Sequence, residues 1–173
     1  MKWEASCGDI LDERADVLVC SANVFLNLSG GVGGAILLRY GNEMQEALHR
    51  FLRESEKNFV EQGDVVVMPA CGLPYKAVLH AVAVDGFYQT SPQIVSQVVA
   101  KSLERAATLG AKRVALTALA TGYGRMSISD FAESLAGVLK TEFPPIESVV
   151  VCVRGPSDYE CLRTAISRSA TLG

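Results

Sequence analysis

The sequence has little of the positive charge that nucleic-acid-binding proteins use. Its 173 residues carry 16 Lys and Arg against 19 Asp and Glu, for a net charge of −3, and no cluster of basic residues stands out. This balance argues against a surface for nucleic acid or for an anionic membrane, so we expect neither as a partner. An anionic metabolite is still compatible with it, because backbone N–H groups bind anions without net positive charge.

Residues that bind metals or form disulfides are also scarce. The number of cysteines is five, which is odd, and no two of them form a CxxC pair. We therefore expect neither a disulfide framework nor a structural metal site. The only histidines are His49, expected on a helix surface, and His80, which ends an apolar run. For His80 a structural role is favoured over that of a catalytic base.

Long hydrophobic runs are absent as well. No apolar segment approaches the roughly 18 residues of a membrane span, and the N-terminus, MKWEASCGDI, does not resemble a signal peptide. We predict a cytoplasmic protein. A length of 173 residues with 49% hydrophobic content suits one domain over residues 1–173. The oligomeric state cannot be inferred from the sequence.

Predicted strands and helices alternate along the chain. Short Val-rich or otherwise apolar segments predict strands at 2–6, 16–21, 64–68, 77–84, 113–116 and 148–153. Apolar residues at helical spacing predict helices at 42–53 and 92–109, and two capping boxes, Ser127 with Asp130 and Ser157 with Glu160, predict two more helix starts. The pattern indicates an α/β fold with one sheet covered by helices on both faces. In such sheets ligands bind outside the carboxyl ends of the strands.

A glycine-rich loop follows the second predicted strand. Residues 23–36 read NVFLNLSGGVGGAI and lead into a helix-forming run at 35–40. Glycines allow close backbone approach to a ligand, and a helix start attracts phosphate, so this segment predicts a phosphate cradle with Asn23 beside it. The alternative is an ordinary flexible connection. A dinucleotide fingerprint fits less well, because the spacing GGVGG differs from G-x-G-x-x-G.

Two further segments stand at predicted strand ends. Residues 118–126, ALATGYGRM, offer backbone N–H groups and an aromatic wall at Tyr123; the alternative is an ordinary strand-to-helix turn. Two glycine-rich loops in one small domain favour a clamp for a phosphate or diphosphate. After the first strand, the carboxylate of Asp9 could accept from the exocyclic amine of a purine, or serve only as a turn or cap residue.

In this order, these segments resemble the macrodomain family of ADP-ribose-binding modules. The family pattern has a GDI start, an apolar strand, NAAN, a GGGV loop followed by AI, a strand ending in His-x-Val, and a TG-x-x-G loop. It is matched here, nearly over the whole chain, by residues 8–10, 16–19, 20–23, 29–36, 80–82 and 121–124. The resemblance implies a three-layer α/β/α sandwich with a mixed central sheet of about six strands.

The resemblance also implies a role for each matching residue. Asp9 would accept from the adenine amine, Asn23 would bind hydroxyls of the distal ribose, and the planar guanidinium of Arg154 could stack on adenine. The remaining implied contacts to the ligand are Ile10 near the adenine, Ser29, Gly30, Gly31, Val32 and Gly33 around the diphosphate and distal ribose, and Ala120, Thr121, Gly122, Tyr123 and Gly124 over the phosphates. No cofactor and no metal is implied.

The sequence departs from the family pattern at four places, one of which is the loop at Tyr123, one residue shorter than its commonest form. Cys20 replaces the first Asn of NAAN, Ser29 replaces the usual first glycine of the loop, and Gly33 stands where many family hydrolases have a proposed catalytic Asp. One hypothesis is a hydrolase of an ester-type bond at the distal ribose, acting on ADP-ribosylated protein or O-acetyl-ADP-ribose, with Asn23 as its catalytic residue. The others are a non-catalytic reader of ADP-ribose, favoured by Gly33, and a domain that serves only as a partner surface.

Overall fold

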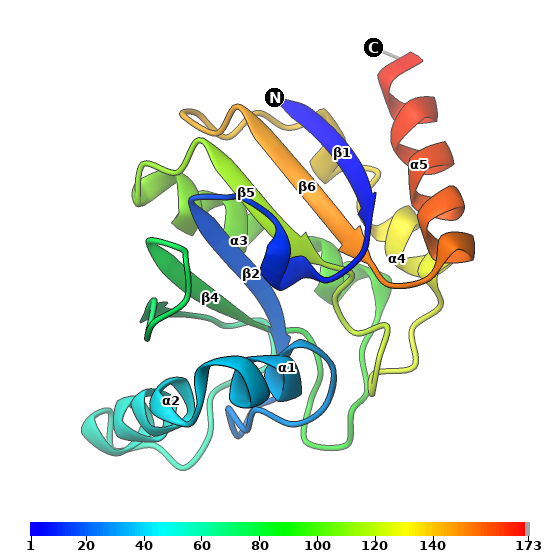
Figure 1. The fold of residues 1–173 in the computed structure, drawn as a ribbon. Helices are drawn as coiled ribbons and strands as arrows, with labels where there is room; N and C mark the ends of the chain where they lie inside the picture. The colour runs from blue at the N-terminus through cyan, green and yellow to red at the C-terminus, as the bar shows by residue number, and fades with distance from the viewer. Residues whose placement is uncertain (172–173) are drawn as a thin grey trace.

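A six-stranded sheet forms the centre of the computed structural model, which describes residues 1–171 (Figure 1). The strands are β1 (Lys2–Cys7), β2 (Val17–Ala22), β3 (Val65–Pro69), β4 (Ala77–Val82), β5 (Arg113–Thr117) and β6 (Ser148–Val153). Their order is β1-β6-β5-β2-β4-β3, and only the edge strand β3 runs antiparallel to its neighbour. The predicted mixed sheet is confirmed.

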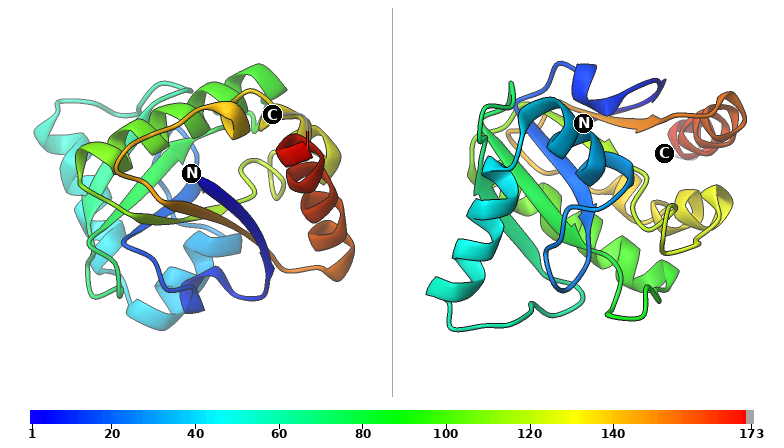
Figure 2. Two further views of the ribbon diagram at one scale, coloured as in Figure 1. Left: turned by 90° about the horizontal axis from the view of Figure 1, so that it is seen from above. Right: turned by 60° about the horizontal axis from the view of Figure 1, so that its bottom comes forward.

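Helices cover both faces of this sheet (Figure 2). One face carries α1 (Gly31–Tyr40) and α2 (Glu43–Glu54), and the other carries α3 (Pro92–Thr108), α4 (Ile128–Ser134) and α5 (Pro156–Thr171). Short 3-10 helices lie at η1 (Ile10–Asp12) and η2 (Val138–Lys140). In the described part of the chain, no helix is both long and apolar enough to span a membrane.

A hydrophobic core lies on each face of the sheet, and both follow from the alternation of side chains along each strand. In β2, Val17 and Val19 pack toward α3, whereas Leu18 and Cys20 pack toward α1 and α2. Because both faces of the central strands are buried, these strands read as continuous apolar runs. The predicted three-layer α/β/α arrangement is confirmed.

The helix starts agree with the sequence in two of three cases. The hydroxyl of Ser91 caps α3 by accepting from the N–H of Ile94 at 3.3 Å, and Ser127 caps α4 by accepting from the N–H of Asp130 at 3.0 Å. The predicted capping box at Ser157 is wrong, because a cap there would start the helix at Asp158, whereas α5 already begins at Pro156. Proline suits the first helical position, where its missing N–H costs nothing.

Helix α4 is also shorter than the helical spacing of the apolar residues Phe131, Leu135 and Val138 predicts. It ends at Ser134, and Val138 belongs to the separate helix η2. The intervening segment contains Gly137, a residue that favours interruption of a helix.

The two ends of the parallel strands differ in chemistry. At the end where these strands begin, Asp16 accepts from the N–H groups of Lys112 and Arg113 at 2.8 and 3.0 Å and pairs with Lys76 at 2.8 Å. The hydrogen bond from Lys76 and these N–H groups lower the pKa of Asp16 to about 2. At the opposite, carboxyl end of the strands, the loops after β2, β4 and β5 emerge together (Figure 2).

Candidate functional site

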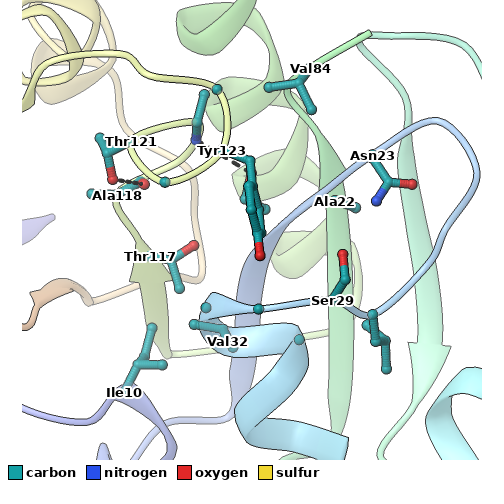
Figure 3. A pocket seen from close by; sticks show the side chains of 18 of the residues that line it. Ile10, Ala22, Asn23, Ser29, Val32, Val84, Thr117, Ala118, Thr121 and Tyr123 are labelled. Atoms are coloured by element: carbon teal, nitrogen blue, oxygen red, sulfur yellow. Dashed lines mark hydrogen bonds between the residues drawn. The ribbon is translucent and has the colours of Figure 1, made fainter. Parts of the chain in front are cut away.

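A cavity of about 570 Å³ opens at the carboxyl ends of the strands (Figure 3). Every site residue predicted from the sequence lines it, except Asp9. The ends of β2, β5 and β6 form its floor, and the two glycine-rich loops form its walls. The structure therefore brings together segments that are far apart in the sequence.

The first wall is the start of α1, which lies inside the glycine-rich segment. The sequence placed this helix at 35–40, but it begins at Gly31, with Gly30 as its cap residue at φ +55°. The first intrahelical bond runs from the N–H of Gly34 to the carbonyl of Gly30, at 2.8 Å. The N–H groups of Gly31, Val32 and Gly33 therefore have no acceptor within the helix. They form a row of donors at the cavity wall.

The second wall is the loop after β5. It is closed by hydrogen bonds from Arg125 N–H to the Gly122 carbonyl and from Met126 N–H to the Ala120 carbonyl, each at 3.1 Å. A Cβ atom on Gly124 would lie 2.6 Å from the carbonyl oxygen of Ala120, so this turn requires glycine. Among the described residues, nothing accepts from the N–H groups of residues 122–124.

Tyr123 connects the two walls. Its side chain points into the cavity (Figure 3) and reaches across it to Gly30. Its ring centroid lies 5.7 Å from that of Tyr88. Tyr88, in the loop after β4, also lines the cavity and was not predicted, because nothing in its local sequence places it near the other loops.

Asn23 lines the cavity but uses its amide to shape its own loop. Its Oδ1 atom accepts from the N–H groups of Phe25 and Asn27 at 3.0 and 3.3 Å, and its Nδ2 atom donates to the carbonyl of Asn27 at 3.1 Å. One N–H of the amide is left to donate to a ligand. The resemblance assigned Asn23 to ribose binding; the structure adds a role in holding the loop.

Helix α2 supports the same loop from behind. The Oε1 atom of Gln45 accepts from the N–H of Leu28 at 2.6 Å, and its Nε2 atom donates to the carbonyl of Leu26 at 3.0 Å. His49 lies 3.0 Å from Oδ1 of Asn27 and 2.9 Å from Nε2 of Gln45. His49, expected on the surface, is half-buried and helps to fix the loop.

A pair of charges borders the other end of the cavity. One carboxylate oxygen of Asp9 accepts from the N–H of Leu11 at 3.0 Å, and the other pairs with Arg39 at 3.0 Å. Asp9 itself does not line the cavity, although the residues on both sides of it do. Arg154 and Asp158 also line the cavity. Arg39 was missed because its pairing with Asp9 spans two distant segments.

His80 is fully buried beneath the cavity. Its Nδ1 atom lies 3.5 Å from Sγ of Cys20, and nothing in the described chain bonds its Nε2 atom. Burial lowers the pKa of His80 to about 4 and raises the pKa of Cys20 to about 12. Both side chains are therefore uncharged at neutral pH, and a buried imidazole with so low a pKa is a weak base, which fits a structural role better.

Most lining residues that the sequence analysis missed lie on strand ends or beside the predicted loops. Besides those already described, they are Gly8, Ser21, Ala22, Val84, Thr117, Ala118, Cys152 and Val153. Following each predicted strand to its carboxyl end would have found most of them. Within residues 1–171, no group of three His, Cys, Asp or Glu could hold a metal ion.

The model of the Macro domain family matches residues 19–135, which include both glycine-rich loops. The chain belongs to the macro domain family. Relatives of this macro domain include an uncharacterized protein of Mycobacterium bovis, 30% identical over 168 residues, which are 96% of this chain and 45% of that protein. An uncharacterized protein of Pyrobaculum aerophilum is 31% identical over 156 residues, 88% of this chain and 84% of that protein. The macro domain thus spans less than half of the mycobacterial relative.

Solved structures show the same fold. A variant of the Oceanobacillus iheyensis macrodomain, solved with ADPR, is similar to this chain at a TM-score of 0.87. The two are 20% identical, and the similarity covers 96% of this chain and 92% of that one. The α/β/α arrangement of this chain is therefore the same fold as that of the solved Oceanobacillus iheyensis macrodomain.

Proposed function

We propose that this macro domain binds ADP-ribose and hydrolyses an ester-type bond at its distal ribose. The substrates would be proteins modified on an acidic side chain, or O-acetyl-ADP-ribose. The observation that carries the proposal is the pair of donor rows, residues 31–33 and 122–124, on opposite walls of one cavity. Backbone donors at a helix start and in a tight turn suit a diphosphate. Family membership and the ADPR-containing structure of a neighbour support this choice of ligand.

The ligand would lie along the cavity with its diphosphate between the two walls. Its adenine would extend toward Ile10 and Arg154, with the Asp9 carboxylate beyond, oriented by Arg39. Its distal ribose would lie at Asn23, whose remaining amide N–H can donate to a hydroxyl oxygen. Tyr123 would move aside or close over the phosphates.

The proposed reaction requires positioning more than strong acids or bases. For a protein modified on an acidic side chain, water attacks the anomeric carbon of the distal ribose, the bond from this carbon to the ester oxygen breaks, and the side chain leaves as a carboxylate. For an acetyl group on another ribose hydroxyl, water would attack the acetyl carbonyl carbon instead, and the ribose hydroxyl would leave. No carboxylate stands at Gly33, so an oxygen of the substrate's own phosphate would position the water and accept its proton. The donors of the first wall would stabilise the developing charge, and we expect a modest rate.

A non-catalytic reader of ADP-ribose is the second candidate. Two observations favour it: the absence of a side chain at Gly33, and the use of both polar atoms of Asn23 within its own loop. A reader needs the same cavity and the same donors, but it does not need a water molecule positioned to attack the ligand.

Release of ADP-ribose from a protein mono-ADP-ribosylated on Glu or Asp tests the proposal. Two variants sharpen the result. Asn23→Ala removes every bond of the amide, whereas Asn23→Asp keeps acceptors for Phe25 and Asn27 and replaces the N–H donors with a negatively charged oxygen. We expect release by the wild type and loss of it in both variants. No release, with ADP-ribose still protecting the protein against heating, would instead make the domain a reader.

A further inference from the structure

Exposed aromatic side chains gather at the Asn23 end of the cavity. Phe25, Phe87, Tyr88 and Tyr123 are 48%, 86%, 42% and 61% exposed, and we call this set the aromatic rim. They come from the loops after β2, β4 and β5. Large apolar side chains that remain in contact with water, clustered beside a cavity, mark an interaction surface.

The aromatic rim is held in place by contacts between the loops. The ring of Phe25 lies 3.7 Å from the Cβ position of Gly86, and the ring of Tyr88 packs against Tyr123. A carboxylate oxygen of Asp85 accepts from the N–H groups of Phe87 and Gln89, each at 2.8 Å. This turn fixes the backbone that carries Phe87, whose side chain stays exposed to solvent.

The rim adjoins the position that the proposed function gives to the distal ribose. The N–H of Phe25 donates to Oδ1 of Asn23, which lines the cavity, whereas Phe25 and Phe87 lie outside the lining. Tyr88 and Tyr123 belong to both the lining and the rim. The surface is thus continuous with the cavity at the end where the modified side chain would leave.

The charges around the rim point to the kind of partner. Residues 23–30 and 85–90, which carry three of the four aromatic residues, contain no Lys or Arg, and the loop that carries Tyr123 has one, the exposed Arg125. A strand of nucleic acid could stack on these rings, but in these three segments it would find a single cation for its phosphates. Apolar side chains of a polypeptide need no such cation, and burying aromatic surface favours their binding.

We propose that the aromatic rim binds apolar side chains next to the ADP-ribosylated residue of a modified protein. The rim thereby selects among targets that present the same ADP-ribose. This inference rests on the proposed function, since it needs ADP-ribose in the cavity with its distal ribose at Asn23. At Phe25 and Phe87, which lie outside the lining, it adds a recognition surface that free ADP-ribose does not touch.

Binding of two peptides tests the inference by calorimetry. Each carries one ADP-ribose through a non-hydrolysable linkage, flanked by Leu and Phe in the first and by Ser and Gly in the second. Burial of one or two aromatic rings predicts that the wild type binds the first about 5- to 20-fold more tightly. The double variant Phe25→Ser, Phe87→Ser should lose this preference and keep its affinity for free ADP-ribose. Leu38→Ser, at a side chain on α1 that is 91% exposed and outside the cavity, should keep both.

Each other outcome has a distinct meaning. Equal affinity of the wild type for the two peptides overturns the rim proposal, as does a double variant that retains the preference or weakens free ADP-ribose and both peptides alike. Tighter binding of an oligonucleotide carrying the same linked ADP-ribose than of the first peptide also overturns it, in favour of nucleic acid. Failure of the wild type to bind free ADP-ribose overturns the proposed function, and the rim proposal with it.

Discussion

The side chain of Tyr123 lies directly over Gly30, on the opposite wall of the cavity. A Cβ atom at position 30 would overlap the Tyr123 hydroxyl and lie 2.7 Å from Cε2 of the same ring. Gly30 also has a φ of +55°, a conformation that other residues adopt only with strain. Two independent constraints therefore require glycine at this position.

Gly30→Ala should weaken ADP-ribose binding by about 1–3 kcal/mol, because the added methyl group strains the start of α1 and displaces Tyr123. Calorimetry measures the change. In the Gly30→Ala background, Tyr123→Ala should recover part of the affinity, since it removes the overlap and leaves the backbone strain. Unchanged affinity in Gly30→Ala would show that the donors of the first wall do not hold the ligand.

Replacing Gly33 and replacing Gly34 by alanine should change the stability of the fold in opposite directions. A Cβ atom on Gly33 would lie 3.1 Å from Cα of Leu28, a residue fixed by its bond to Gln45, whereas one on Gly34 meets nothing within 4 Å. We expect Gly34→Ala to stabilise the fold by about 0.5–1 kcal/mol, because alanine favours helix and restricts the unfolded chain. Gly33→Ala should destabilise it. Urea unfolding of the two variants beside the wild type compares them, and equal shifts would contradict the packing of Leu28 on α1.

Asp9→Ala should weaken binding of ADP-ribose by about 1–3 kcal/mol, the scale for removing a charged acceptor. The same substitution should weaken the binding of inosine diphosphate ribose much less, because hypoxanthine has no exocyclic amine to donate a hydrogen bond. Calorimetry with both ligands separates the effects. An equal loss for the two would mean that Asp9 acts only through its cap on η1 and its pair with Arg39.

The hydrogen bonds and the ion pair of Asp16 should make the stability of the fold fall with pH in the acid range. Because its pKa falls from 3.8 to about 2 on folding, its contribution is present above pH 4 and is lost as the pH falls from about 4 to about 2. Asp16→Asn should lower stability at pH 7 by about 2–3 kcal/mol, given about 1.4 kcal/mol per unit of pKa shift. Denaturant unfolding at pH 7 and pH 2.5 should show this difference shrinking at the lower pH. A difference that does not change with pH would place the effect elsewhere.

The sequence predicted the layers of the fold because strands and helices have different apolar periods. It also predicted both walls of the cavity, since glycine clusters after apolar runs are local signals. It placed the start of α1 too late, because glycines argue against helix although Gly31, Gly33 and Gly34 form its first turn. Tertiary packing decides such a case, and packing cannot be read from a short window.

Interactions between distant segments escaped prediction. Arg39 with Asp9 and Tyr88 with Tyr123 join residues whose spacing carries no signal. Asn23 was assigned to a ligand because its type and position suited that role; its bonds to Phe25 and Asn27 became apparent only in the folded loop.

Strand β2 has Asp16 immediately before it and Asn23 immediately after it. The carboxylate that ties β2, β4 and β5 together thus lies one strand length from the loops that would select a ligand. Libraries that randomise only Phe25, Phe87 and Tyr88 would therefore leave this tie untouched, and they would also keep Asn23, Asp85 and the buried Val24 and Leu26. The domain should accept new target preferences through such exchanges while keeping its resistance to denaturant.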